Sequence, residues 1–100
     1  MAAYIIVDID VHDPAGYEEY KRLAPSSIRR YGGEYLVRGG SVQTLEGEWA
    51  LKRVVVLEFE SAERGRAWWD SQEYRAARDL RQQTARARMI LVEGVPVTTA

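Results

Sequence analysis

The stretch AYIIVDIDV at residues 3–11 decides the fold, and KRVVVLEFE at residues 52–60 repeats its pattern. Alternate side chains of a β-strand point to opposite faces. In both stretches the two faces are apolar, and the second face of the first strand, with Tyr4, Ile6 and Asp8, also carries carboxylates. The helices that a chain of this length can form cover one face of a sheet. We therefore expect a second copy of the chain to cover the other face.

The composition is that of one ordinary globular domain. The chain has 100 residues, of which 46% are hydrophobic and 29% charged, and these values predict a single domain with a modest core. We place this domain at residues 1–95 and interpret residues 96–100 as a tail. The net charge of −1 provides no field that would attract nucleic acid or an anionic membrane surface.

Several functional classes are excluded by what the sequence lacks. It contains no cysteine, so it has no disulfide, no thiolate nucleophile and no thiolate metal site. No signal peptide is visible, and no apolar stretch approaches the ~20 residues that span a bilayer. We therefore expect a cytoplasmic protein without a membrane partner.

The chain order predicts an α+β fold of the ferredoxin-like β-α-β-β-α-β type, with a four-stranded antiparallel sheet and both helical regions on one face. Asp13 and Pro14 suit the start of the first helix, while Pro25 either kinks it or begins a second short helix that runs to Tyr31. Residues 41–49 are ambiguous, since 42–45 fits a short strand and Glu46-Gly47 a tight turn. The other elements are expected as strands at 3–11, 34–38, 52–60 and 89–93, and as helices at 62–70 and 72–86.

The uncovered face of this sheet is predicted to be apolar with a few charges. Exposed contiguous apolar surface normally marks an interface, so this face would pair with its equivalent in a homodimer. The side chains expected there are Tyr4, Ile6, Asp8, Leu36, Arg38, Val54, Val56 and Glu58.

Two sets of short motifs resemble a known family. One set is Tyr17-x-x-Tyr20, Ala24-Pro25, Tyr31-Gly32-Gly33, the run from Tyr35 to Gly40, Glu46-Gly47 and Trp49; the other is the run from Val55 to Ser61, Trp68-Trp69-x-Ser71-x-Glu73-Tyr74, Arg81 and Val92-Glu93-Gly94. Together they resemble a family of small bacterial proteins defined as domain of unknown function thirteen-thirty, over nearly the whole chain. Trp69 departs from the tyrosine that this family often has.

The resemblance implies a fold similar to the dimeric α/β-barrel superfamily, in which two ferredoxin-like sheets face each other. That superfamily includes cofactor-free monooxygenases, lactone isomerases, haem enzymes and transcription-linked sensors. The fold alone therefore says little about the reaction.

Asp8 and Glu58 are the first candidate catalytic residues. Both are expected on the uncovered face, where a carboxylate in a dimer cavity could act as a general base. Arg38, expected on the same face, could pair with either or bind an anionic ligand through its forked guanidinium. The alternative is an ion-pair network that sets the register of the dimer.

His12 is the third candidate catalytic residue, because it is the one histidine and follows the first strand at an end of the sheet. The alternative is a solvated loop residue. One histidine without cysteine or clustered ligands predicts no metal site, and haem ligation would depend on His12 alone.

Arg81, Tyr74 and Trp68 are candidate ligand-binding residues. The helical spacing places Arg81 in an apolar stripe near Tyr74, where its guanidinium needs a partner such as Glu58, a backbone carbonyl or a ligand carboxylate. The alternative is a stem packed on Tyr74 with the charge in water. Trp68 and Trp69 point about 100° apart, so one is expected to anchor the helix on the sheet while the other lines a groove. The alternative is that both pack in the core.

Two classes of function remain open. The first is a small-molecule binder or enzyme without cofactor, of oxygenase-like or isomerase-like chemistry, because no activated nucleophile is present. Its pocket would lie between sheet and helices or inside the dimer barrel. The second is a non-catalytic dimeric ligand-sensing or interaction module with structural charges. The arginines between residues 64 and 88 fit a solvated helix face better than a nucleic-acid surface.

Overall fold

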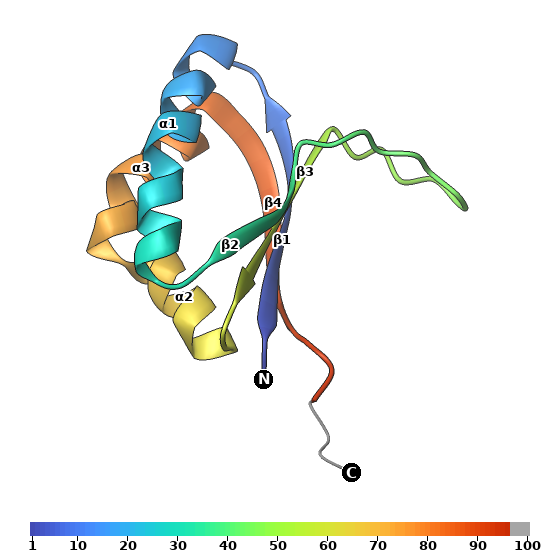
Figure 1. Cartoon of the computed structure of the whole chain (residues 1–100). Helices are drawn as coiled ribbons and strands as arrows, with labels where there is room; N and C mark the ends of the chain where they lie inside the picture. The colour runs from blue at the N-terminus through green and yellow to red at the C-terminus, as the bar shows by residue number, and fades with distance from the viewer. Residues whose placement is uncertain (97–100) are drawn as a thin grey trace.

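The computed structural model describes residues 1–96, and residues 97–100 of the expected tail lie outside the described residues. One four-stranded sheet has the order β2-β3-β1-β4, and all its neighbouring strands are antiparallel. Figure 1 shows the three helices on one side of this sheet, as expected for the ferredoxin-like order. The elements are β1 (Ala3–Val11), α1 (Pro14–Arg30), β2 (Glu34–Arg38), β3 (Arg53–Phe59), α2 (Ala62–Asp70), α3 (Gln72–Thr84) and β4 (Ala85–Glu93).

Each helix begins where a side chain satisfies its free N–H groups. The Asp13 carboxylate accepts from the Gly16 N–H at 3.2 Å before α1, and the hydroxyls of Ser61 and Ser71 do the same for α2 and α3. Of the two alternatives for Pro25, a second short helix is absent, since α1 is one helix from Pro14 to Arg30 with Pro25 inside it. A proline inside a helix removes one hydrogen bond but does not end a helix that packs well.

The last helix is shorter and the last strand longer than the sequence indicated. We expected a helix to residue 86 and a strand from 89, but α3 ends at Thr84 and β4 begins at Ala85. In this part of β4, Ala85 and Ala87 alternate with Arg86 and Arg88. These four residues pair with the last four residues of β1. Alanine and arginine favour helix, so local preference hid a strand that the ladder to β1 stabilises.

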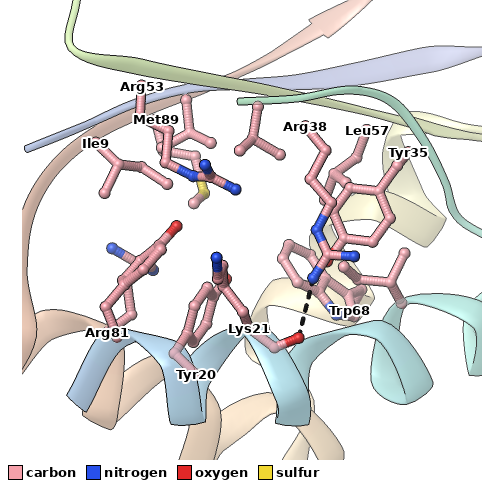
Figure 2. A pocket seen from close by; sticks show the side chains of 14 residues that line it. Ile9, Tyr20, Lys21, Tyr35, Arg38, Arg53, Leu57, Trp68, Arg81 and Met89 are labelled. Carbon is pink, nitrogen blue, oxygen red and sulfur yellow. Dashed lines mark hydrogen bonds between the residues drawn. The ribbon is translucent and has the colours of Figure 1, made fainter. Parts of the chain in front are cut away.

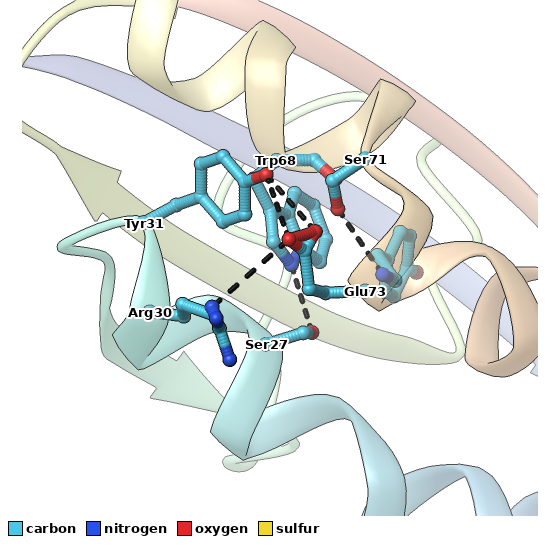
Figure 3. Close-up of polar contacts among 7 residues, drawn as sticks. Ser27, Arg30, Tyr31, Trp68, Ser71 and Glu73 are labelled. Carbon is cyan, nitrogen blue, oxygen red and sulfur yellow. Dashed lines mark hydrogen bonds and ion pairs between the residues drawn. The ribbon is translucent and has the colours of Figure 1, made fainter.

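The core lies between the sheet and the helices. Trp68 is its centre: its ring is 4.0 Å from that of Tyr74 and 5.7 Å from that of Phe59, measured between centroids. Figure 3 shows the polar contacts that join α1 to α2 and α3 here. The Trp68 indole N–H donates to the Ser27 hydroxyl at 3.0 Å, and the Tyr31 hydroxyl donates to Glu73 at 3.1 Å. These contacts fix the distance between the helices.

The opposite face of the sheet carries no helix (Figure 1). Its apolar side chains include Ile6, Ile90 and Val92, which are exposed. The loop at residues 39–52 extends away from the sheet on this side and forms no strand, so the short strand at 42–45 is absent. In place of the expected tight turn, Glu46 and Gly47 form a bend, with Gly47 at a φ of 75°. Leu45 and Trp49 of this loop are 91% and 71% exposed.

The prediction that Arg38 lies on the uncovered face is wrong. A β-bulge between Tyr35 and Val37 shifts the register of β2 against β3, so that Val37 pairs with Val56 and Arg38 with Val55. Val55 belongs to the buried face. An extra residue in a strand reverses the alternation beyond it, and Arg38 therefore points towards the helices.

Candidate functional site

A pocket between the sheet and the helices gathers four cationic side chains, those of Lys21, Arg38, Arg53 and Arg81. We call it the cationic pocket. Figure 2 shows their nitrogen atoms directed into the space between the two layers. The rest of its wall is apolar or aromatic and consists of Val7, Ile9, Tyr17, Tyr20, Ile28, Tyr35, Val55, Leu57, Trp68 and Met89.

Each layer supplies two of the four cations. Arg53 begins β3 on the face of Val55 and Leu57, and Arg38 joins it because of the bulge in β2. Lys21 follows Tyr17 by one helical turn on α1 and so shares its inward face. Arg81 lies in the buried stripe of α3 and is 5% exposed.

A chain of polar groups crosses the inner end of the pocket. The hydroxyls of Tyr20 and Tyr74 lie 2.8 Å apart, and the Arg81 Nε donates to the Tyr74 hydroxyl at 3.3 Å. Burial raises the pKa of Tyr20 well above its ordinary value, and the neighbouring Tyr74 raises it further. Burial also raises the pKa of Tyr35. Both phenols are therefore neutral near pH 7 and able to donate hydrogen bonds.

Glu58, one of the three partners suggested for Arg81, does not contact it. Glu58 lies on the uncovered face of β3, on the other side of the sheet from α3. The contact that Arg81 makes instead is to Tyr74, the residue on which its stem was expected to pack. Unlike a snorkelling arginine, it stays buried.

Arg38 and Arg53 are held at the entrance by their stems and by aromatic rings. The Arg38 guanidinium lies 4.6 Å from the centroid of the Tyr35 ring and donates to the Lys21 carbonyl at 3.0 Å. Arg53 lies 5.7 Å from the Tyr17 ring. Its Nε is buried and has no hydrogen-bond partner among the described residues. Such an unsatisfied donor is costly in a protein interior.

The pocket has a narrow inner part and a wide mouth. The inner cavity has a volume of about 20 Å³, which holds about one water molecule. Lys21, Arg38 and Arg53 also line an open hollow of about 520 Å³, together with Glu18 and Arg22. The second volume is in the range of ligand sites, so these three long side chains stand between the hollow and the core.

The candidate catalytic carboxylates lie elsewhere. Asp8 and Glu58 are both on the uncovered face, as expected, but Asp8 pairs with Val54 and Glu58 with Tyr4. Four residues along a strand separate them by roughly 13 Å. Asp8 accepts from the Lys52 backbone N–H at 3.0 Å, and hydrogen bonding to Glu58, with its charge, raises the pKa of Tyr4. Asp8 also lines a hollow of about 270 Å³ beside Trp49.

His12 is exposed, and its backbone N–H donates to the Thr84 carbonyl at 3.0 Å. It is not among the residues that line the cationic pocket. Within residues 1–96 no three histidine or acidic side chains gather to form a metal-binding group. Nor, in that part of the chain, is any helix long and apolar enough to cross a bilayer.

The two neighbouring tryptophans have different surroundings, although both pack on the core. Trp68 is 1% exposed, anchors α2 in the core and contributes to the wall of the cationic pocket. Trp69 lines a separate groove beside Gly65 and Leu91, and the Arg78 guanidinium lies 4.7 Å from the centroid of its ring.

Sequence reasoning missed Lys21 and Arg53 as pocket residues. Both signals were present, because Arg53 has the same alternation as Val55 and Leu57, and Lys21 has the helical spacing of Tyr17 and Ala24. What the sequence lacked was a sign that these cations meet Arg81, which depends on how α1 and α3 cross the sheet.

The family model described as "Domain of unknown function (DUF1330)" matches residues 2–95. The chain belongs to this family. The resemblance in the aromatic and glycine motifs is thereby confirmed. No curated protein matches the sequence.

Solved structures of the same fold extend the comparison of this family member. A protein of unknown function from Rhodopseudomonas palustris is 18% identical with a TM-score of 0.75, over 96% of this chain and 84% of the other. SnoaB, a cofactor-independent oxygenase from Streptomyces nogalater, is 13% identical with a TM-score of 0.62, over 99% and 98%. A variant of MhuD with two manganese protoporphyrin IX molecules per active site is 26% identical with a TM-score of 0.51, over 98% and 99%. Together they support the ferredoxin-like fold class.

Proposed function

We propose that the protein binds a small organic molecule in the cationic pocket and works as a homodimer. One observation carries the binding proposal: polar groups from α1, α3, β2 and β3 converge on an otherwise apolar and aromatic wall. Ligand sites have this construction, with a few placed polar groups in an apolar hollow. The oxygenase and porphyrin-binding proteins of the same fold support a small-molecule role.

The homodimer is supported by the uncovered face of the sheet. Exposed Ile6, Ile90 and Val92 form an apolar area flanked by the exposed loop 39–52, and a monomer rarely leaves such a contiguous area in water. The charges among them are of both signs, since Asp8 lies opposite Arg88 and Asp10 opposite Arg86 in the ladder of β1 and β4. Charges of both signs are easier to bury against a second copy than charges of one sign.

In its enzymatic form, we propose a cofactor-free reaction of oxygenase-like or isomerase-like type. Cations and neutral phenols stabilise negative charge that develops on a substrate, as in an enolate. Among residues 1–96 the wall of the pocket carries no carboxylate, so Asp8 and Glu58 can act as general bases only on a ligand bound at the other face of the sheet. His12, the one histidine of the chain, lies away from the pocket, so the porphyrin of MhuD is not carried over.

The alternative is a dimeric ligand-sensing module, supported by a pocket wall that carries no carboxylate or histidine among residues 1–96. A sensor needs ligand affinity without turnover. Incubating the protein with a bound ligand under oxygen and following the ligand mass separates the two forms, because only the enzyme converts it. A cytoplasmic location stays a prediction of the sequence.

Native mass spectrometry of protein purified from its own host tests the proposal most directly. We expect the mass of two chains together with a small additional mass that is lost on denaturation. A single-chain mass at micromolar concentration would contradict the dimer. A bare mass, followed by a fragment screen in which no compound shifts the NMR signals of pocket residues, would contradict small-molecule binding.

A further inference from the structure

Resting on the proposed function, we propose that the ligand of the cationic pocket is an oxyanion, a carboxylate or a phosphate, carried on an apolar or aromatic body. Four cations that face one another leave the site with an excess of positive charge. The ligand supplies the negative charge that this chain does not place there.

The charge balance of the site is the first argument. Glu18 is the one acid that lines the mouth; it lies 2.9 Å from the Lys21 Nζ, and its side chain is 69% exposed. None of the ion pairs among the described residues includes Arg38, Arg53 or Arg81. Like charges repel more strongly where burial lowers the effective dielectric constant. An anion that enters the pocket relieves this repulsion.

The unused donors are the second argument. Arg53 has a buried Nε without a partner among residues 1–96, and the one hydrogen bond from the Arg81 guanidinium there is to a neutral phenol. A guanidinium presents five N–H donors in a planar fork that matches the two oxygens of a carboxylate or phosphate. The donors of the pocket are thus suited to oxyanions.

The aromatic side chains show what the rest of the ligand requires. Tyr17, Tyr35 and Trp68 form much of the wall, with Met89 and Ile9 at the sheet. The inner cavity of about 20 Å³ is too small for such a body unless side chains move, and the outer hollow of about 520 Å³ is lined by charged residues. We infer that the oxyanion lies between Lys21, Arg38 and Arg53, while the body displaces these side chains and reaches the aromatic wall behind them.

A purely structural role for the cations predicts a different response to mutation. If Arg53 and Arg81 only support the fold, then Arg53→Met and Arg81→Met destabilise the free protein. If they form an anion site, replacing the cation with a shorter apolar side chain removes repulsion and leaves stability unchanged or higher, because buried charges are often replaced by apolar groups without loss. Anion affinity is lost in either variant.

The test uses three probes that share a naphthalene body, namely 2-naphthoate, 2-naphthyl phosphate and the neutral 2-naphthamide, titrated into the full chain and followed by NMR. We expect one of the anions to bind at least tenfold more tightly than the amide and to shift the signals of Tyr35 and Arg53. Stronger binding of the naphthoate identifies a carboxylate site and stronger binding of the phosphate a phosphate site. Rising salt concentration should weaken the binding of the anions and leave the binding of the amide unchanged.

Arg53→Met and Arg81→Met should each weaken the preferred anion at least tenfold while changing naphthamide affinity less than twofold. The matched control is Arg86→Met, which removes the same charge from the opposite face of the sheet and should leave all three affinities unchanged. Arg53 is half-buried at the mouth, so its variant keeps the test valid even if Arg81→Met fails to fold.

Two results would overturn the inference in distinguishable ways. Equal binding of amide and anions at the pocket would reject the oxyanion and leave small-molecule binding intact. If none of the probes shifts the NMR signals of pocket residues, both the oxyanion and the pocket as the ligand site are rejected. The same holds if only Arg86→Met weakens the binding of the anions.

Discussion

The two faces of the sheet use charge in opposite ways. On the uncovered face, Asp8 and Asp10 lie opposite Arg88 and Arg86 in the ladder of β1 and β4, so that face carries charges of both signs. On the covered face, four cations meet around a cavity with no acid among the described residues that line it. A face with charges of both signs suits contact with a second copy, whereas a cavity with charges of one sign suits an anion. This difference is why we propose assembly on one face and ligand binding on the other.

The largest difference between the faces should appear in stability. Trp68→Ala removes the fully buried ring at the centre of the core and should lower the free energy of unfolding by about 3–5 kcal/mol. Trp49→Ala, the matched change on the exposed loop beside the uncovered face, should cost less than about 1 kcal/mol in the monomer. Urea denaturation at low protein concentration measures both. Equal losses would mean that loop 39–52 packs on the same chain.

Assembly should depend on the uncovered face alone. Val56→Glu places a charge among Ile6 and Ile90 and should raise the dimer dissociation constant at least about 100-fold, which corresponds to about 2.8 kcal/mol. Sedimentation across a concentration series measures it. Ala76→Glu, which adds the same charge at an exposed position of α3, is the control. A wild-type chain that sediments as a monomer would remove the basis of the comparison.

A buried phenol of the covered face should make the free energy of unfolding fall with rising pH in the alkaline range. Because burial raises the pKa of Tyr20 in the folded state, the folded protein keeps a proton that the unfolded chain releases above about pH 10. The stabilisation is complete below that pH and is lost as pH rises towards the folded pKa. Wild type should lose up to about 1.4 kcal/mol per pH unit more than Tyr20→Phe. Urea denaturation of both proteins from pH 9 to 11 measures this difference. Equal changes in the free energy of unfolding with pH would show that Tyr20 ionises normally.

The smallest effect is expected for one charge pair of the uncovered face. Asp8 and Arg88 are directly opposed across β1 and β4, and such pairs contribute roughly 0.2–1 kcal/mol. A double-mutant cycle with Asp8→Asn and Arg88→Gln, measured by urea denaturation, should give a coupling energy in that range and favourable in sign. A coupling energy of zero would mean that the two side chains do not interact. It would weaken the contrast between the face with charges of both signs and the pocket with charges of one sign.

The sequence predicted most of the fold because its strands and caps are local signals. β1, β2 and α2 have the predicted bounds, and Asp13, Ser61 and Ser71 cap the helices as their positions indicate. The boundary between α3 and β4 was wrong because alternating alanine and arginine favour a helix until a neighbouring strand pairs with them. That pairing is long-range and leaves no local mark.

The candidate site was predicted less well. Arg81 was expected in an apolar stripe and is buried there, and Trp68 and Tyr74 pack beside it. Asp8, Glu58 and His12 do not meet at the cationic pocket, and Arg38 reaches it only through a bulge that alternation does not reveal. A single extra residue in a strand changes which face every later side chain occupies.

The sequence by itself determined that this chain has a two-faced sheet covered on one side, since alternation and helical spacing are properties of neighbouring residues. The tertiary structure alone decided that Lys21, Arg38, Arg53 and Arg81 share one pocket. The physical reason is that these positions depend on a bulge and on the packing of helices against strands, and those contacts join residues far apart in the chain.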